Sequence, residues 1–369
     1  MTLARPYHLC FVNSMRGWGG AEVWMHETAL ALRDRGVAVS FVANPGSELH
    51  RRAVADGLPV APLTIRVDGA PWTIVGLARR LRRLGATALV ANQTKDVKVG
   101  APAGRLAGLR HILSTRESDF PLKDRPDYRW AFQVLCTGVL VNSEATRRTT
   151  LASAPWLDPA RVHLLYKGID IERFAAGPVP TGPFTVGFVG QLIGRKGVPE
   201  LMTAWSAIDA EVRPERPRLR LAGDGELRAD LERWRGGLRH PDAVEILGYV
   251  EDVPAFYRTL HLLAMPSHAE GFGLAAAEAL ACDVPVVAGD ASSLPEIVRP
   301  GETGLLVPPR DPAALTDALR MLIDDPVRAR SLGLAGGRFV RAAFPRTRTL
   351  DRLLALTGHP DHPPEEHPA

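Results

Sequence analysis

Two glutamates with seven residues between them, Glu270 and Glu278, have the surroundings in this chain that point most directly to chemistry. An apolar run at 262–265 precedes them, and the helix-forming residues 274–281 contain the second glutamate. This pattern predicts a buried strand, a loop that carries Glu270, and a helix that carries Glu278 on its second turn. Between the two carboxylates, the Gly-Phe-Gly backbone and the start of the helix favour an anion. A nucleoside diphosphate sugar, with phosphates in the middle and hydroxyls at both ends, has the complementary layout.

A second candidate segment, residues 190–197, follows a predicted strand at 184–189. It contains the adjacent cations Arg195 and Lys196, and a helix is expected from Val198. Two cations beside a helix N-terminus can stabilise a departing diphosphate. Each segment alone could be an ordinary surface loop, because isolated glutamates and Arg-Lys pairs in loops are usually solvated. Together with the strand, loop and helix patterns around them, they favour a binding site.

The third candidate segment is Arg-Gly-Trp-Gly-Gly-Ala-Glu at 16–22, a turn between the first predicted strand and the first predicted helix. Glycines allow a backbone to approach a ligand closely. The turn is not a G-x-G-x-x-G sequence and no GK[ST] follows it, so neither a Rossmann dehydrogenase nor a P-loop enzyme is indicated. The sequence also lacks Asp-x-Asp, His-x-x-x-His and clusters of His or Cys ligands. We therefore expect no catalytic metal and no cofactor.

The segment from Glu270 to Glu278 resembles the signature of retaining glycosyltransferases of family 4, which have the GT-B fold. Shorter segments at 141–146, 168–174, 222–225, 295–298, 304–307 and 311–312 are also similar to that family, and the resemblance spans about residues 7–355. It implies that Glu270 meets the hydroxyls of the donor sugar and that Glu278 meets the ribose. It further implies transfer on one face of the sugar, with the departing phosphate accepting the proton of the acceptor.

The sequence departs from the family pattern at several positions. Gln191 stands where the family usually has an arginine, and we expect Arg195 to replace that charge. Lys167 stands where an asparagine is usual, and Asp283 replaces a glycine. The segment 115–120 lacks the histidine that many members carry near the reacting carbon, so Arg116 or Glu117 is expected to contact substrate instead.

The family resemblance and the residue patterns together predict a site with three groups of residues. The catalytic residues are expected to be Arg195, Lys196 and Glu270. The donor-binding residues are expected to be Gly19, Gly20, Gly190, Gly223, Gly271, Phe272, Gly273, Leu274 and Glu278. The acceptor-binding residues are expected to be Asn92, Lys95, Arg116 and Glu117.

Strand-like and helix-like segments alternate along the whole chain, which is typical of α/β domains with parallel sheets. A stretch dense in Pro and Gly at 177–183 is the best linker candidate. The fold class is therefore α/β with the GT-B architecture, in which two Rossmann-like domains face a cleft. The predicted boundaries are 1–176 for an acceptor domain, 184–342 for a nucleotide-sugar donor domain, 343–357 for a helix returning to the first domain, and 358–369 for a disordered tail. The predicted strands are 9–12, 37–42, 60–64, 88–91, 110–114, 138–142, 162–165, 184–189, 218–222, 244–247, 261–265, 284–288 and 304–307.

The net charge of +4 conceals an asymmetry between the two halves. Residues 1–175 contain 24 Lys and Arg against 15 Asp and Glu, a net charge of +9, and the remainder carries −5. A predicted helix at 71–84 has four arginines and an apolar stripe, so it suits either an anionic membrane surface or ordinary packing against a sheet. No nucleic-acid-binding pattern occurs. The three unpaired cysteines and the lack of a signal or membrane-spanning segment favour a cytoplasmic protein, peripheral at the inner face of the membrane.

The sequence therefore predicts a metal-independent retaining glycosyltransferase that moves a sugar from a nucleoside diphosphate donor to an acceptor hydroxyl. A glycan or lipid-linked acceptor in lipopolysaccharide or other envelope synthesis fits the basic first half. Two alternatives stay open: a nucleotide-sugar epimerase of the same fold, and a non-catalytic protein that binds sugar nucleotides. The first would need additional acid and base side chains in its first domain, and the second would not need Lys196, Glu270 and Glu278 together.

Overall fold

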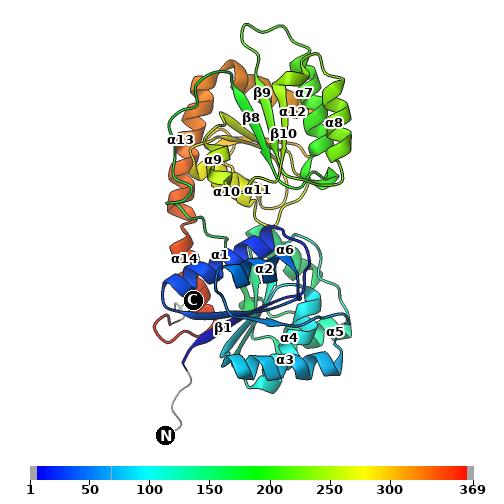
Figure 1. Cartoon of the computed structure of the whole chain (residues 1–369), viewed down its shortest axis with the longest axis vertical. Coiled ribbons are helices and arrows are strands. Elements are labelled where there is room, and N and C mark those ends of the chain that lie inside the picture. The colour runs from blue at the N-terminus through cyan, green and yellow to red at the C-terminus, as the bar shows by residue number, and fades with distance from the viewer. Residues whose placement is uncertain (1–5, 68, 364–369) are drawn as a thin grey trace. The chain divides into compact units, whose positions relative to one another are not determined.

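A computed structural model describes residues 6–67 and 69–363 of the chain. The chain divides into two compact units, one formed by residues 1–167 with 347–369 and the other by residues 168–346. By this division the stretch at 177–183 that was predicted as a linker lies inside the second unit. Each unit is a parallel β-sheet with helices on both faces (Figure 1).

The first unit has a seven-stranded sheet in the order β3-β2-β1-β4-β5-β6-β7. All neighbouring strands are parallel, and the order reverses direction between β1 and β4, which is the kind of switch point where ligands bind in open α/β sheets. The strands are β1 (His8–Asn13), β2 (Ala38–Ala43), β3 (Val60–Pro62), β4 (Ala88–Ala91), β5 (His111–Arg116), β6 (Gly138–Val141) and β7 (Val162–Leu164).

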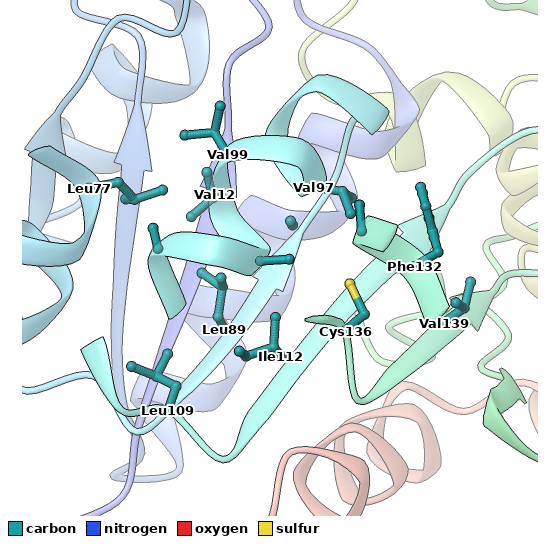
Figure 2. Packing of buried hydrophobic residues seen from close by; sticks show 14 of the residues in the cluster. Val12, Leu77, Leu89, Val97, Val99, Leu109, Ile112, Phe132, Cys136 and Val139 are labelled. Carbon is teal, nitrogen blue, oxygen red and sulfur yellow. The ribbon is translucent and has the colours of Figure 1, made fainter. Parts of the chain in front are cut away.

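Alternating side chains of β1 supply two hydrophobic cores, one on each face of the sheet. Cys10 and Val12 lie in a core with residues of α3, α4 and the π-helical turn η1, and Figure 2 shows Val12 among the side chains of this core. Leu9 and Phe11 lie in the opposite core, with residues of α1, α2 and α14. The helices of this unit are α1 (Gly20–Asp34), α2 (Glu48–Ala55), α3 (Pro71–Leu84), α4 (Thr94–Ala107), α5 (Pro126–Arg129), η1 (Trp130–Leu135), α6 (Glu144–Ser153), η2 (Pro159–Arg161) and α14 (Arg346–Leu356).

The last helix, α14, returns to the first unit, as the predicted fold class requires. Its leucines Leu350, Leu353 and Leu354 are buried in the same core as Leu9 and Phe11. Residues 358–363 then form a turn, in which the His359 ring lies 4.6 Å from that of Tyr7. The remainder of the predicted tail, 364–369, lies outside the described residues.

The second unit has a six-stranded parallel sheet in the order β10-β9-β8-β11-β12-β13, which reverses between β8 and β11. Its core gathers apolar side chains of the central strands with those of α7, α8, α12 and α13. The strands are β8 (Thr185–Val189), β9 (Arg218–Ala222), β10 (Val244–Gly248), β11 (Leu262–Met265), β12 (Val286–Gly289) and β13 (Gly304–Val307). The helices are η3 (Gly194–Lys196), α7 (Val198–Asp209), α8 (Arg228–Gly236), η4 (Pro241–Ala243), α9 (Val253–Tyr257), α10 (Leu274–Ala281), α11 (Leu294–Ile297), α12 (Pro312–Asp324) and α13 (Pro326–Ala343).

All thirteen strands predicted from the sequence occur in the described part of the chain, and the fold class is confirmed. The differences lie at strand ends. The strand predicted at 284–288 begins at Val286 because Pro285, which precedes it, has no N–H to donate to a neighbouring strand. The three cysteines are buried and none forms a disulfide.

Helix α3 packs its apolar stripe against the first sheet, as the second interpretation of residues 71–84 expected. Leu77 and Leu81 are fully buried in the core. The opposite face of α3 exposes Trp72, which is 74% accessible, together with Arg79 and Arg83. Within the described residues, no helix combines the length and the apolar character that crossing a membrane requires.

Candidate active site

The carboxyl edge of the second sheet is built from glycines that let two loops touch. Gly190 follows β8 with φ 152°, and Gly223 follows β9 with φ 142°. A Cβ on Gly223 would lie 1.8 Å from the carbonyl oxygen of Gly190, so only glycine fits at this position. Both are predicted donor-binding residues, and the structure places them in direct contact.

The loop after β8 also packs against the loop after β11, across the point where the strand order reverses. Gly197, with φ 72°, directly precedes α7, and a Cβ there would lie 2.0 Å from the carbonyl oxygen of Pro266. The two loops are further joined through Arg195. Its carbonyl oxygen accepts a hydrogen bond from the backbone N–H of His268 at 2.9 Å, and its guanidinium donates to the carbonyl oxygen of Ala269 at 2.7 Å. Arg195 therefore helps to hold the two loops together, a contact that the sequence did not predict.

Lys196 and Glu270 form an ion pair where these two loops meet. The Lys196 ammonium donates to Glu270 Oε1 at 2.6 Å. Only 17% of the lysine side chain and 9% of the glutamate side chain are exposed. A charge-assisted bond in such a sheltered place is stronger than one at the surface, because little water screens it. Two predicted catalytic residues are thus brought together.

The remaining donor-binding candidates follow directly along the chain. Gly271 and the buried Phe272 lead to Gly273, which has φ 93° and directly precedes α10 as its N-cap. The Phe272 ring meets that of Phe344 edge-on, with 5.5 Å between centroids, which anchors the loop. Leu274 is the first residue of α10 and is half-buried.

Glu278 lies on the second turn of α10, as predicted, and is half-buried. Its Oε2 accepts a hydrogen bond from the hydroxyl of Tyr257 at 3.0 Å. Tyr257 is the last residue of α9 and was not predicted as a site residue. Only its position in an apolar segment before β11 is visible in the sequence, and that position indicates a core residue.

In the first unit, Glu22 holds the glycine turn after β1. Its Oε2 accepts the backbone N–H of Gly19 at 3.1 Å. Its Oε1 accepts side-chain amides from Asn13 at 2.9 Å and from Asn92 at 3.3 Å. Asn92, a predicted acceptor-binding residue, therefore lies beside the turn that contains Gly19 and Gly20.

Glu117, another predicted acceptor-binding residue, is paired with Lys167. Lys167 Nζ lies 2.6 Å from Glu117 Oε2 and donates to the carbonyl oxygen of Gly20 at 3.2 Å. The amide of Asn142 also reaches Glu117, at 3.4 Å. Two departures from the family sequence pattern are thus in contact. Lys167 stands where an asparagine is usual, Glu117 lies in the segment that lacks the histidine, and together they form a nearly buried ion pair beside the glycine turn.

Arg116 and Lys95 are the other two acceptor-binding candidates. Arg116 ends β5, and its guanidinium donates to the carbonyl oxygen of Phe120, so its own loop occupies part of its hydrogen-bonding capacity. Burial lowers the pKa of Arg116 from its ordinary value. Lys95 lies on the first turn of α4. In the described part of the chain, no three side chains of His, Cys, Asp or Glu gather into a group that could hold a metal ion.

The fold defines a class of protein with two parallel-sheet units, of which the second carries the Lys196–Glu270 pair at the carboxyl edge of its sheet. Among solved structures, HepE (Alr3699) from Anabaena in complex with UDP is similar over 94% of this chain and 98% of its own, with 20% identity and a TM-score of 0.81. The lipopolysaccharide outer core galactosyltransferase WaaB is similar with a TM-score of 0.71 and 15% identity, over 95% of this chain and 98% of its own. At these identities both likenesses concern the fold.

The sequence comparisons establish the family. A family model described as "Glycosyltransferase Family 4" matches residues 18–173. A second model, described as "Glycosyl transferases group 1", matches residues 183–325. The D-inositol 3-phosphate glycosyltransferase 1 of Catenulispora acidiphila is 30% identical over 92% of this chain and 90% of its own length. The GDP-mannose-dependent alpha-(1-6)-phosphatidylinositol monomannoside mannosyltransferase of Mycobacterium tuberculosis is 30% identical over 80% of this chain and 81% of its own. This chain belongs to glycosyltransferase family 4 and is a retaining enzyme that uses a nucleotide sugar.

Replacing Lys196 by alanine should lower kcat more than it weakens donor binding, because negative charge builds on the diphosphate only as the glycosidic bond breaks. We expect a loss of about 10²–10³-fold in kcat, the usual effect of removing one group that stabilises transition-state charge. Steady-state kinetics combined with donor binding by calorimetry would check this. Arg195→Ala is the companion variant. If Lys196→Ala weakened donor affinity and kcat/KM equally and left kcat intact, the lysine would serve ground-state binding alone.

Asp96, at the start of α4, gives the first unit a distinctive pH dependence. Its Oδ2 accepts the backbone N–H groups of Ser14 and Gln93, both at 3.1 Å, and burial raises the pKa of its carboxyl to about 6. Since the folded pKa lies above the unfolded one, folding favours the protonated form, and this contribution is lost as the pH rises from about 4 to 6. The expected loss is about 2–3 kcal/mol in the free energy of unfolding.

Asp96→Asn keeps an oxygen for both N–H groups and removes the titration. Urea unfolding between pH 4.5 and 7.5 should therefore show a flatter pH profile for Asp96→Asn than for the wild type. The exposed Asp34→Asn is the control, with a profile parallel to that of the wild type. Parallel profiles for Asp96→Asn and the wild type would show that Asp96 does not titrate in this range.

Proposed function

We propose that this enzyme transfers a hexosyl group from a nucleoside diphosphate hexose to a hydroxyl of a polyol or glycan acceptor in cell-envelope synthesis. The single observation that carries the proposal is the sheltered Lys196–Glu270 ion pair at 2.6 Å, set among glycines at the carboxyl edge of the second sheet. It supplies a cation for a diphosphate and a carboxylate for sugar hydroxyls at adjacent positions. The glycines let the loops that carry this pair pack closely against one another.

In the proposed reaction, the bond between the anomeric carbon and the diphosphate oxygen breaks as the acceptor oxygen bonds to the same carbon. The acceptor's proton passes to the departing phosphate. Lys196, Arg195 and the start of α10 stabilise the charge on that phosphate, and Glu270 and Glu278 accept hydrogen bonds from the sugar and the ribose. Asn92, Lys95, Arg116 and Glu117 belong to the acceptor side, where the Glu117–Lys167 pair fixes the glycine turn.

The relatives narrow the proposed substrates. Two of them are named for transfer to D-inositol 3-phosphate or to a phosphatidylinositol mannoside, and one of these uses GDP-mannose. The structurally similar HepE was solved with UDP-glucose as well. We therefore favour an inositol-containing acceptor over a lipopolysaccharide core, and a UDP- or GDP-hexose as donor.

A donor and acceptor panel tests the proposal. UDP- and GDP-hexoses would be combined with D-inositol 3-phosphate, with phosphatidylinositol vesicles and with lipopolysaccharide core, and nucleotide release and product anomers would be measured. We expect acceptor-dependent release of one nucleotide, retained anomeric configuration by NMR, and undiminished activity in excess EDTA. Interconversion of the donor sugar without nucleotide release would identify an epimerase instead. Binding of a donor without turnover with any acceptor would identify a non-catalytic protein.

The outer face of α3 suits an anionic membrane that would present a lipid-linked acceptor. Trp72 and Arg79 lie on this exposed face with Arg83, whereas Arg80 and Arg82 donate to backbone carbonyl oxygens of their surroundings. Each arginine near an anionic leaflet contributes about 1 kcal/mol, and salt screens the attraction. The first half's charge of +9 adds to it.

We expect the full-length protein to sediment with anionic vesicles at low salt and to be released at high salt. Arg79→Gln combined with Arg83→Gln should weaken this association about 10-fold or more, since two such contributions are lost. Arg328→Gln combined with Arg338→Gln, two exposed arginines of α13, is the matched control and should change it little. Equal binding to neutral and anionic vesicles would favour a soluble acceptor.

A further inference from the structure

We infer that Tyr257 is a positioning residue that orients the Glu278 carboxylate for recognition of the donor's ribose. The inference rests on the proposed function, because it concerns how the nucleotide is held. It assigns a role to a residue that contacts no predicted ligand itself. The evidence is the place of the tyrosine hydroxyl in the second unit and the way in which α9 and α10 are fixed there.

Tyr257 is held rigidly. It ends α9, which begins with Asp252 accepting the backbone N–H of Ala255 at 3.0 Å. The Tyr257 side chain is completely buried, and its ring lies 6.2 Å from that of Phe174 in a tilted arrangement. A buried tyrosine hydroxyl requires a hydrogen-bond partner, and here that partner is Glu278 Oε2 at 3.0 Å.

The direction of this hydrogen bond is fixed as well. Burial, together with the nearby charge of Glu278, raises the pKa of Tyr257 well above 10. The hydroxyl therefore keeps its proton throughout the physiological range and donates to the carboxylate. A donated bond to a carboxylate is stronger than one between neutral groups.

Glu278 has a fixed backbone but a side chain that needs orienting. Its neighbours on α10, Ala277 and Ala279, are completely buried, which packs this part of the helix into the core. The Glu278 side chain is half-buried, and its Oε2 lies 3.0 Å from the Tyr257 hydroxyl. By binding Oε2, the Tyr257 hydroxyl selects one rotamer, and a carboxylate recognises two adjacent ribose hydroxyls well only when its plane is fixed.

Tyr257→Phe tests the inference, because it removes one oxygen and preserves the buried ring. Calorimetry would compare binding of UDP and GDP with binding of their 2′-deoxy and 3′-deoxy analogues. The wild type should prefer the ribonucleotide. In Tyr257→Phe this preference should shrink by about 10- to 150-fold, the range expected when a hydrogen bond to a charged group is lost. A purely structural role would weaken the ribonucleotide and its deoxy analogues equally.

Two further variants complete the design. Tyr7→Phe is the matched control, because the Tyr7 hydroxyl is hydrogen-bonded to Thr357 at 2.6 Å in the other unit, and it should leave the preference unchanged. In a Glu278→Ala background, adding Tyr257→Phe should have no further effect on the preference. An undiminished preference in Tyr257→Phe, or an equal additional effect without Glu278, would overturn the inference and leave the proposed function standing. Failure of the wild type to bind any nucleoside diphosphate would overturn both.

Discussion

The approach of two backbones, at Gly223 and the carbonyl oxygen of Gly190, sets the shape of the second unit's carboxyl edge. No side chain fits between them, since even a Cβ would lie 1.8 Å from that oxygen. This contact ties the loop after β8 to the neighbouring loop after β9, and Gly197 ties it equally closely to the loop after β11. With its backbone fixed on both sides, the loop presents Lys196 to Glu270 at a definite distance. The Lys196–Glu270 ion pair thus depends on glycines, which have no side chain, at positions 197 and 223.

The sequence reveals the strands and the helices around the site because each is encoded locally. Apolar runs of four to six residues predict buried parallel strands, and Gly273 followed by alanines predicts the start of α10. Glu270, Lys196 and Glu278 are found through their position after such strands, where the carboxyl ends of a parallel sheet gather loops. For this reason Glu270 lies on a loop and Glu278 on the second turn of α10, at the positions predicted for them.

Contacts between side chains that are far apart in the chain could not be predicted from the sequence. Lys196 and Glu270 are 74 positions apart, and no pattern in the sequence specifies which carboxylate a given lysine meets. The same holds for Glu117 with Lys167, which are separated by two strands, and for the Tyr257 hydroxyl, whose residue looks like ordinary core. These contacts depend on the order of strands in the sheet and on rotamers, and neither is a local property.

The pairing of Lys196 with Glu270 has a consequence for competition among anions in the cell. Inorganic phosphate can reach the lysine only by drawing it away from a carboxylate that is 9% exposed, and the negative charge of the phosphate repels that carboxylate. Leaving a sheltered charge unpaired is strongly unfavourable. A nucleoside diphosphate hexose brings sugar hydroxyls to the glutamate as its phosphates meet the lysine, so both charges are satisfied together. In the proposed reaction, Lys196 and Glu270 therefore neutralise each other until a donor binds. This pairing discriminates against abundant simple anions before the enzyme contacts the nucleotide base or the acceptor.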